Sequence, residues 1–174
     1  MTFAKYPSLV GRVVLVTGGA SGIGADVVRA FAANDARVAF FDIQEEAGRA
    51  LAEDLAGSAH KPLFLPCDLL DVEAMRAAIA KVHGALGPIA VLVNNAGNDQ
   101  RHGVADLTPE QWDLSQNVNL RPQFFAAQAV QPQMKALGHG SIINFSSIAW
   151  RFGADQMVAY ASAKAAITGL TATG

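Results

Sequence analysis

The sequence has little of what marks a membrane, secreted or nucleic-acid-binding protein. Its one cysteine, Cys67, excludes an internal disulfide framework and a thiolate metal cluster, and we expect it to be a small buried residue rather than a reactive one. No apolar run approaches the roughly 18 residues of a membrane span, and residues 1–12 lack the apolar core of a signal peptide. Thirteen basic residues against fifteen acidic ones leave no basic excess for nucleic acid or anionic lipid. We therefore expect a cytoplasmic protein without nucleic-acid, membrane or metal partners.

What the chain does contain is enough apolar sequence for one folded domain. Its 174 residues are 51% hydrophobic and only 16% charged, which is typical of a globular protein and not of a disordered one. We find no linker, internal repeat or low-complexity tract. The sequence therefore predicts a single domain over residues 1–174.

Short β-branched runs alternate with longer alanine-rich amphipathic stretches along the whole chain. The runs that predict strands are residues 12–16, 37–41, 62–66, 89–93 and 141–145. The stretches that predict helices are residues 22–34, 44–56, 71–85, segments within 109–137, and 156–170. The predicted strands are nearly all apolar, as parallel strands covered on both faces are. The order indicates an α/β fold, a Rossmann-type doubly wound parallel sheet flanked by helices.

A glycine-rich turn, Thr17-Gly-Gly-Ala-Ser-Gly-Ile-Gly24, follows the first predicted strand and opens the first helix. Gly18 suits the tight turn, Gly22 a close approach of backbone to pyrophosphate, and Gly24 close packing of helix and strand. Ser21 and Ile23 lie between them, at a helix N-terminus whose free amides favour phosphate. A glycine turn alone can be purely structural, but the strand–turn–helix context favours a nucleotide site.

Acidic residues follow the next two predicted strands. Asp42, followed by Ile43, comes at the end of the second predicted strand. A carboxylate at this position accepts hydrogen bonds from a ribose 2′-hydroxyl and repels a 2′-phosphate. NAD is therefore predicted over NADP. Asp68, followed by Leu69, comes after the third strand and suits the adenine amino group. A helix cap or a solvated loop acid is an alternative for Asp68.

Asn94-Asn-Ala-Gly97 follows the fourth predicted strand. Small residues let the backbone pass beneath a flat ligand, and side-chain amides can tie neighbouring strands together. We expect Asn94 to be architectural, and Asn95, Ala96 and Gly97 to line the cofactor.

Tyr160 and Lys164 are four residues apart in the last predicted helix, so they share one helix face. An ammonium beside a phenol stabilises the phenolate and lowers the tyrosine pKa toward neutrality. Such a tyrosine can take a proton from an alcohol or give one to a carbonyl. The spacing alone is weak, and a half-buried helix tyrosine is the alternative.

The ordered motifs together resemble the short-chain dehydrogenase/reductase family. They are T-G-G-A-S-G-I-G, the acid at 42, C-D-L at 67–69, N-N-A-G, N-V-N at 117–119, the region of Ser147, and Y-A-S-A-K. The resemblance spans residues 12–170 and assigns the family's catalytic residues to Asn119, Ser147, Tyr160 and Lys164. Ser147 is chosen over Ser146 because the family's serine lies thirteen residues before the tyrosine, and Asn119 is chosen over Asn117 because it begins the x-N-L triplet.

The resemblance implies an NAD-dependent oxidoreductase that moves a hydride between an alcohol or hemiacetal carbon and nicotinamide. Tyr160 would be the base, Ser147 would hold the substrate oxygen, and Lys164 would lower the tyrosine pKa and bind the nicotinamide ribose. Asn119 would hold a water that relays protons from Lys164. The family also implies a homo-oligomer, a dimer or tetramer, in the intact form.

Within the family, three segments are similar to aldose 1-dehydrogenases that use NAD: Y-P-S-L, N-A-G-N-D-Q-R-H at 95–102 and I-N-F-S-S-I-A-W at 143–150. A small, sugar-like substrate is therefore expected. Polar loop residues at the predicted strand ends suit a polyhydroxylated ligand, namely Asn98, Asp99, Arg101, His102, Trp150 and Arg151.

The family's chains continue past the tyrosine–lysine helix, whereas this sequence ends at Gly174. We expect it to be the N-terminal part of a subunit, with its fifth strand an exposed apolar edge. Two alternatives stay open. One is a non-catalytic NAD-binding fragment, and the other is a family member that acts on a non-sugar secondary alcohol or ketone.

Overall fold

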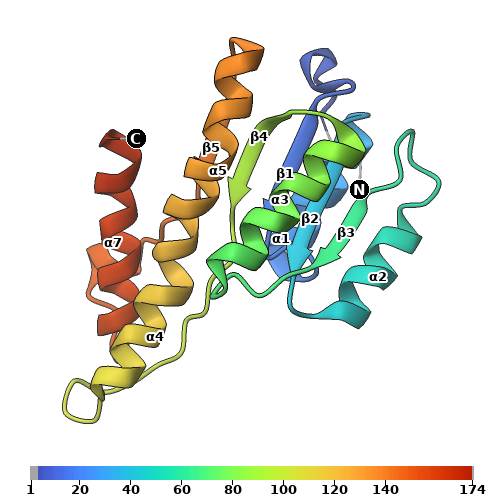
Figure 1. Cartoon of the computed structure of the whole chain (residues 1–174). Coiled ribbons are helices and arrows are strands. Elements are labelled where there is room, and N and C mark those ends of the chain that lie inside the picture. Colours follow the sequence, from blue (N-terminus) through green and yellow to red (C-terminus); the bar gives the residue numbers. More distant parts are fainter. Residues whose placement is uncertain (1–3, 174) are drawn as a thin grey trace.

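A computed structural model describes residues 4–173 of the chain, so residues 1–3 and 174 of the expected domain lie outside the described range. Its centre is one parallel five-stranded sheet in the order β3-β2-β1-β4-β5 (Figure 1). The strands are β1 (Val13–Thr17), β2 (Arg37–Asp42), β3 (Leu63–Pro66), β4 (Ile89–Asn94) and β5 (Ser141–Asn144). This is the Rossmann-type α/β architecture that the sequence predicts.

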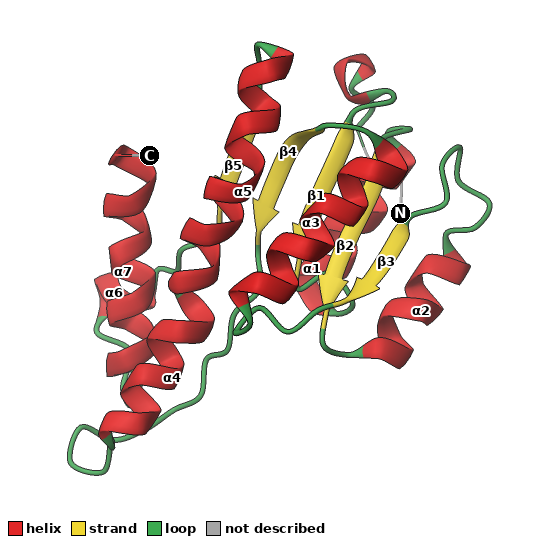
Figure 2. Ribbon diagram, in the orientation of Figure 1, coloured by secondary structure: helices red, strands yellow, loops and turns green. Residues whose placement is uncertain are grey.

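Helices cover both faces of this sheet (Figure 2). They are α1 (Gly22–Ala33), α2 (Glu45–Asp54), α3 (Val72–Leu86), α4 (Pro109–Asn119), α5 (Arg121–Leu137), α6 (Ala149–Phe152) and α7 (Val158–Thr173), preceded by the short 3-10 helix η1 (Pro7–Leu9). Alternate residues of the strands belong to two different buried clusters. One joins the sheet to α1 and α2, and the other joins it to α3 and α5. Because both faces are covered, every residue of β1 and β4 is buried.

The last strand and the last helix form one side of the molecule. β5 pairs with β4 along one edge of the sheet, and Ile142 and Ile143 are 37% and 44% exposed. This agrees with the expected apolar edge. α7 packs against α4 and α6 and lies alongside α5 at this edge (Figure 1). The helix that carries Tyr160 and Lys164 is therefore held mainly by other helices.

The predicted order of strands and helices is confirmed, and the helix caps are too. Asp71 caps α3 by accepting from the Ala74 amide, and Thr108 caps α4 in a reciprocal capping box with Gln111. Two short helices, η1 and α6, were not predicted. The last helix begins at Val158 rather than at residue 156, because Gln156 has a positive φ of 58°, which an α-helix cannot contain.

None of the helices within residues 4–173 has the length and apolar character needed to cross a membrane.

Candidate active site

The carboxyl ends of the strands β1 to β4 open onto one groove. In doubly wound sheets this is the edge where ligands bind. The groove is lined by Gly18, Ser21, Ile23, Gly24, Asp42, Ile43, Gln44, Cys67, Asp68, Leu69, Leu70, Asn95, Ala96, Gly97, Asn98, Asp99, Leu114 and Val118. It therefore gathers the predicted cofactor-binding residues from the ends of four strands, β1 to β4, with the exceptions of Gly22, Tyr160 and Lys164.

The turn between β1 and α1 leaves backbone amides open to this groove. Gly18 has a φ of 66°, a conformation that glycine adopts readily. A Cβ on Gly24 would lie 1.9 Å from the Gly18 carbonyl oxygen, so only glycine allows this close packing. Ser21, the N-cap of α1, makes no side-chain capping hydrogen bond. The first-turn amides are therefore not satisfied by the cap and are suited to an anionic group such as a pyrophosphate.

Asp42 is held in place beside this turn. It is only 8% exposed, and its two carboxylate oxygens accept from the backbone amides of Ala20 (2.9 Å) and Gln44 (3.0 Å). Oδ1 also accepts from Gln44 Nε2 at 3.4 Å, whereas Oδ2 keeps a further lone pair for a ligand hydroxyl. Ile43, next in sequence, is 70% exposed and forms part of the groove wall. The carboxylate is thus fixed before any ligand arrives.

The segment after β3 contributes Asp68 and Cys67. Asp68 is exposed, and its Oδ1 accepts from the Leu70 amide at 2.9 Å, so it shapes its own loop while lining the groove. The position of Asp68 is therefore compatible with both roles, contact with an adenine and stabilisation of its own loop.

Cys67 is buried, and burial raises the pKa of its thiol to about 11, with Asp68 and Asp71 adding to the effect. A thiol of this kind is protonated at neutral pH and is a poor nucleophile.

The two asparagines after β4 both hold backbone together. Asn94 donates from Nδ2 to the Gln123 carbonyl (3.2 Å) and to Asn144 Oδ1 (2.9 Å), which makes it architectural, as expected. Asn95 lines the groove, but its Nδ2 also donates to the carbonyls of Thr17 (3.1 Å) and Gly18 (2.9 Å). It therefore fixes the glycine turn as well as lining the ligand site, a second role that the sequence did not indicate.

Lys164 is buried at the end of β5. Lys164 is only 3% exposed, and its Nζ donates to the Phe145 carbonyl oxygen at 2.8 Å. Nζ also lies 5.7 Å from the centre of the Tyr160 ring. Burial lowers the pKa of Lys164 from 10.5 to about 8. The predicted pair is therefore brought together, with the ammonium over the phenol ring and in a desolvated position.

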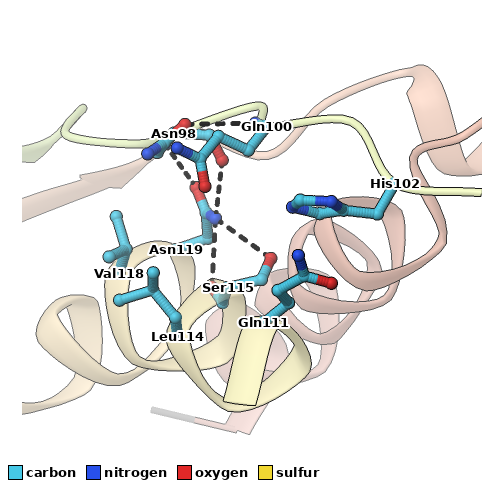
Figure 3. Close-up of a pocket in the computed structure, with 8 residues that line it drawn as sticks. All are labelled: Asn98, Gln100, His102, Gln111, Leu114, Ser115, Val118 and Asn119. Atoms are coloured by element: carbon cyan, nitrogen blue, oxygen red, sulfur yellow. Dashed lines mark hydrogen bonds between the residues drawn. The ribbon is translucent and has the colours of Figure 1, made fainter. Parts of the chain in front are cut away.

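Asn119, at the end of α4, binds the loop that follows β4. Its Oδ1 accepts from the Asn98 amide at 2.8 Å, and its Nδ2 donates to the carbonyls of Asn98 (2.9 Å) and Ser115 (3.0 Å). Figure 3 shows this side chain pointing from the helix to the loop, with His102 extending over the same pocket opposite Gln111. The Asn119 side chain thus already has three backbone partners, and its described contacts position the loop.

Gly97 separates Asn119 from Lys164. A Cβ on Gly97 would lie 3.0 Å from Asn119 Oδ1 and 3.3 Å from Lys164 Nζ, closer than most side chains tolerate. Any larger residue would push one of these groups away. The absence of a side chain at this position therefore lets the loop, the asparagine and the lysine come together.

The two adjacent serines have different partners. Ser146 donates from Oγ to the Lys164 carbonyl oxygen at 2.6 Å and so joins β5 to α7. Ser147 is half-buried two residues before α6, and its Oγ accepts from the Ala149 amide at 3.1 Å. Its hydroxyl proton has no acceptor among the described residues and is free to reach a ligand. These contacts favour Ser147 over Ser146 for the substrate.

Two glutamines near the site were not predicted as site residues from the sequence. Gln116 of α4 donates to the Ala159 carbonyl, one residue before Tyr160, at 3.0 Å. Gln123 of α5 donates to the carbonyls of Asn119 (3.3 Å) and Phe145 (3.4 Å). A signal for Gln123 was present, since it lies at helical spacing with the apolar inner face of α5, which continues through Ala126, Val130 and Met134.

Comparison with known proteins places this site in a family. A family model for short chain dehydrogenases matches residues 12–174. D-xylose 1-dehydrogenase of Caulobacter vibrioides is 50% identical over 171 residues, covering 98% of this chain and 67% of that protein. The probable galactose dehydrogenase GalD of Rhizobium meliloti is 50% identical over 169 residues, with 97% and 66% covered. D-threitol dehydrogenase of Mycolicibacterium smegmatis is 37% identical over 163 residues, with 94% and 63% covered.

The chain thus spans about two thirds of the length of these relatives. The match is continuous, and it includes both the glycine turn after β1 and the tyrosine–lysine pair on α7. Together with the parallel sheet and the groove at its carboxyl edge, the match establishes that this chain belongs to the short-chain dehydrogenase/reductase family of enzymes.

Proposed function

We propose that the protein of which this chain is part is an NAD-dependent oxidoreductase that acts on a sugar-like alcohol or hemiacetal. The observation that carries the proposal is the buried Lys164 beside Tyr160, at the same sheet edge as the groove that contains Asp42. A desolvated ammonium at this position has an evident chemical use, because it stabilises a phenolate. We also propose that residues 1–174 belong to one nucleotide-binding domain.

The residues present fit a nicotinamide dinucleotide, the cofactor type that the family implies. The uncapped first turn of α1 would take the pyrophosphate, with Gly18 and Gly22 permitting its approach. Asp42 would accept from the hydroxyls of the adenosine ribose, and Asp68 or Leu69 would contact the adenine. Asn95, Ala96 and Gly97 would lie beneath the rest of the molecule. The fixed negative charge of Asp42 favours NAD over NADP.

Bound nicotinamide supplies the hydride acceptor. Tyr160, as the phenolate, takes the proton of the substrate hydroxyl. The Lys164 ammonium stabilises that phenolate. Once Tyr160 has taken the proton, the ammonium remains fixed by the Phe145 carbonyl. Ser147 donates its free hydroxyl proton to the substrate oxygen and holds it near the phenol. Asn119 acts on the loop at Asn98 and so keeps Gly97 in place against Lys164.

Two sets of observations favour a sugar-like substrate. The most similar relatives described above are named as a D-xylose and a galactose dehydrogenase. Near the proposed site, the loop after β4 also presents Asn98, Gln100 and His102, whose amides and ring nitrogens suit a polyhydroxylated ligand. A linear polyol or another secondary alcohol is the second candidate, which the relative named D-threitol dehydrogenase favours.

The proposed function is tested by turnover of the intact protein with NAD and a panel of pentoses, hexoses and secondary alcohols. We expect NADH formation that is fastest with an aldose. Tyr160→Phe should reduce kcat by at least about 100-fold, the scale of a lost general base, while NADH binding is kept. Retained turnover in Tyr160→Phe would sink the assignment of the base. NADH binding without turnover on any substrate would instead support a non-catalytic NAD-binding chain.

Cofactor preference is tested at Asp42. We expect Asp42→Asn, which keeps the shape and removes the charge, to lower the ratio of kcat/KM for NAD over NADP by about 10-fold or more, the effect of ~1.4 kcal/mol. Asp68→Asn is the matched control, because it neutralises an acid of the same groove beside the adenine, which both cofactors share. An equal change in the two variants would contradict the role of Asp42.

The pKa of Lys164 predicts a stability cost that depends on pH. The pKa is about 8 in the folded chain and near 10.5 when the chain is unfolded, so between these values the unfolded state binds more protons. The contribution of Lys164 to stability therefore rises with pH from about 8 to about 10.5. We expect Lys164→Met to be more stable than the parent protein at pH 7, with the difference shrinking by pH 10. Urea unfolding at both pH values measures it, and a difference that does not change with pH would contradict the burial of a charged Lys164.

A further inference from the structure

Gln123 is a buried polar residue for which the proposed mechanism has no use. It lies in the first turn of α5 and is only 3% exposed. Among the described residues, its Oε1 is the one buried side-chain nitrogen or oxygen without a hydrogen-bond partner. Leaving a buried acceptor unpaired is destabilising, so such a group calls for a physical reason.

The orientation of the Gln123 amide supplies that reason. Its Nε2 faces two backbone carbonyl oxygens, those of Asn119 at 3.3 Å and Phe145 at 3.4 Å. Exchanging the amide nitrogen and oxygen would direct Oε1 at these same two oxygens, which is repulsive. The amide is therefore held with its nitrogen toward the carbonyls, and the unpaired oxygen is the consequence.

One of these carbonyls is also the partner of the catalytic lysine. The Phe145 oxygen accepts from Lys164 Nζ at 2.8 Å, so Gln123 and Lys164 share one acceptor. The backbone of Gln123 is anchored as well, because its carbonyl accepts from Asn94 Nδ2, which also binds Asn144 Oδ1. Gln123 thus joins the ends of α4, β4 and β5 at the point where the lysine is bound.

We propose that Gln123 is a positioning residue for Lys164: its buried amide fixes the Phe145 carbonyl at the end of β5, and this carbonyl fixes the lysine ammonium. An apolar residue would continue the inner face of α5 without an unpaired acceptor, but it would leave this carbonyl free to turn. Only the effect on turnover rests on the proposed function, since the contact itself does not depend on it.

Among the described residues, few titratable groups surround the Lys164 ammonium, so its titration is sensitive to the hydrogen bond that it makes to the Phe145 carbonyl. Tyr160, on the same helix, is the titratable group that the structure places beside Nζ, and Asn119 approaches it across Gly97. Within residues 4–173, no carboxylate forms an ion pair with Lys164. Burial lowers the pKa of Lys164, and the Phe145 carbonyl is the acceptor that the structure gives to Nζ. Because a carbonyl oxygen favours the charged form of a lysine that donates to it, we expect the loss of this fixed acceptor to lower the pKa of Lys164 further.

The experiment is an NMR titration of the Lys164 side chain in the protein labelled with 13C- and 15N-lysine. The signal is assigned as the one missing in Lys164→Arg. We expect Gln123→Leu and Gln123→Met to lower the pKa of Lys164 by about half a unit or more, in line with a weakened hydrogen bond to the charged form. Gln133→Leu is the matched control, because Gln133 of the same helix also binds strand backbone, the Ile89 amide at 2.9 Å, far from Lys164 in the sheet. It should leave the titration unchanged.

An unchanged Lys164 titration in whichever Gln123 variant folds would overturn the proposal, and so would an equal shift in Gln133→Leu. If both Gln123 variants fail to fold while Gln133→Leu folds, Gln123 is a general core residue and the proposal is also wrong. The titration needs no turnover. A shift in a protein that oxidises none of the tested alcohols would therefore support this inference while contradicting the proposed function.

Discussion

The hydrogen bond from Lys164 Nζ to the Phe145 carbonyl is the interaction on which the rest of the site depends. It places a positive charge at the edge of the sheet, where burial lowers the pKa of the ammonium to about 8. It also ties α7 to β5, and the bond from Ser146 to the Lys164 carbonyl makes the same connection through the backbone. A helix packed mainly on other helices is thereby fixed to the strand end that leads into Ser147.

Helix α4 supports this arrangement from the other side. Gln116 binds the backbone just before Tyr160, and one turn later Asn119 binds the loop that carries Gly97. One rigid element therefore sets both the position of the tyrosine and the spacing across Gly97 to the lysine. Because parallel strands end at the same edge, these groups lie at the edge of the sheet onto which the groove opens, and Gly97 is the one among them that lines it. We propose that the groove and the tyrosine–lysine pair form one extended site, with Asp42 at the end that selects the cofactor and Tyr160 at the end that transfers the proton.

The sequence predicted most of this fold because its signals are local. Buried parallel strands are largely apolar, and Asp71 and Thr108 mark helix starts by capping them. The pairing of Tyr160 with Lys164 follows from helical spacing alone. The start of α7 was misplaced because a positive φ at Gln156, a non-glycine residue, leaves no mark in the sequence.

Contacts between distant segments were harder to predict. The glutamines at 116 and 123 gain their roles from carbonyls more than twenty residues away in sequence, and the second role of Asn95 depends on the turn after β1. The assignment of Asn119 as a holder of water came from the family resemblance. In the structure the described contacts of its side chain are backbone groups of Asn98 and Ser115 and the Ser115 hydroxyl. Such partners are set by the packing of the helices and not by a motif.

The most direct test of a single continuous site is a crystal structure of the protein with NADH. We expect the adenosine ribose within hydrogen-bond distance of Asp42, and the nicotinamide ribose within hydrogen-bond distance of Lys164. The pyrophosphate should lie at the first turn of α1. A cofactor bound in the reverse direction, or one that leaves either Asp42 or Lys164 without contact, would contradict a single continuous site.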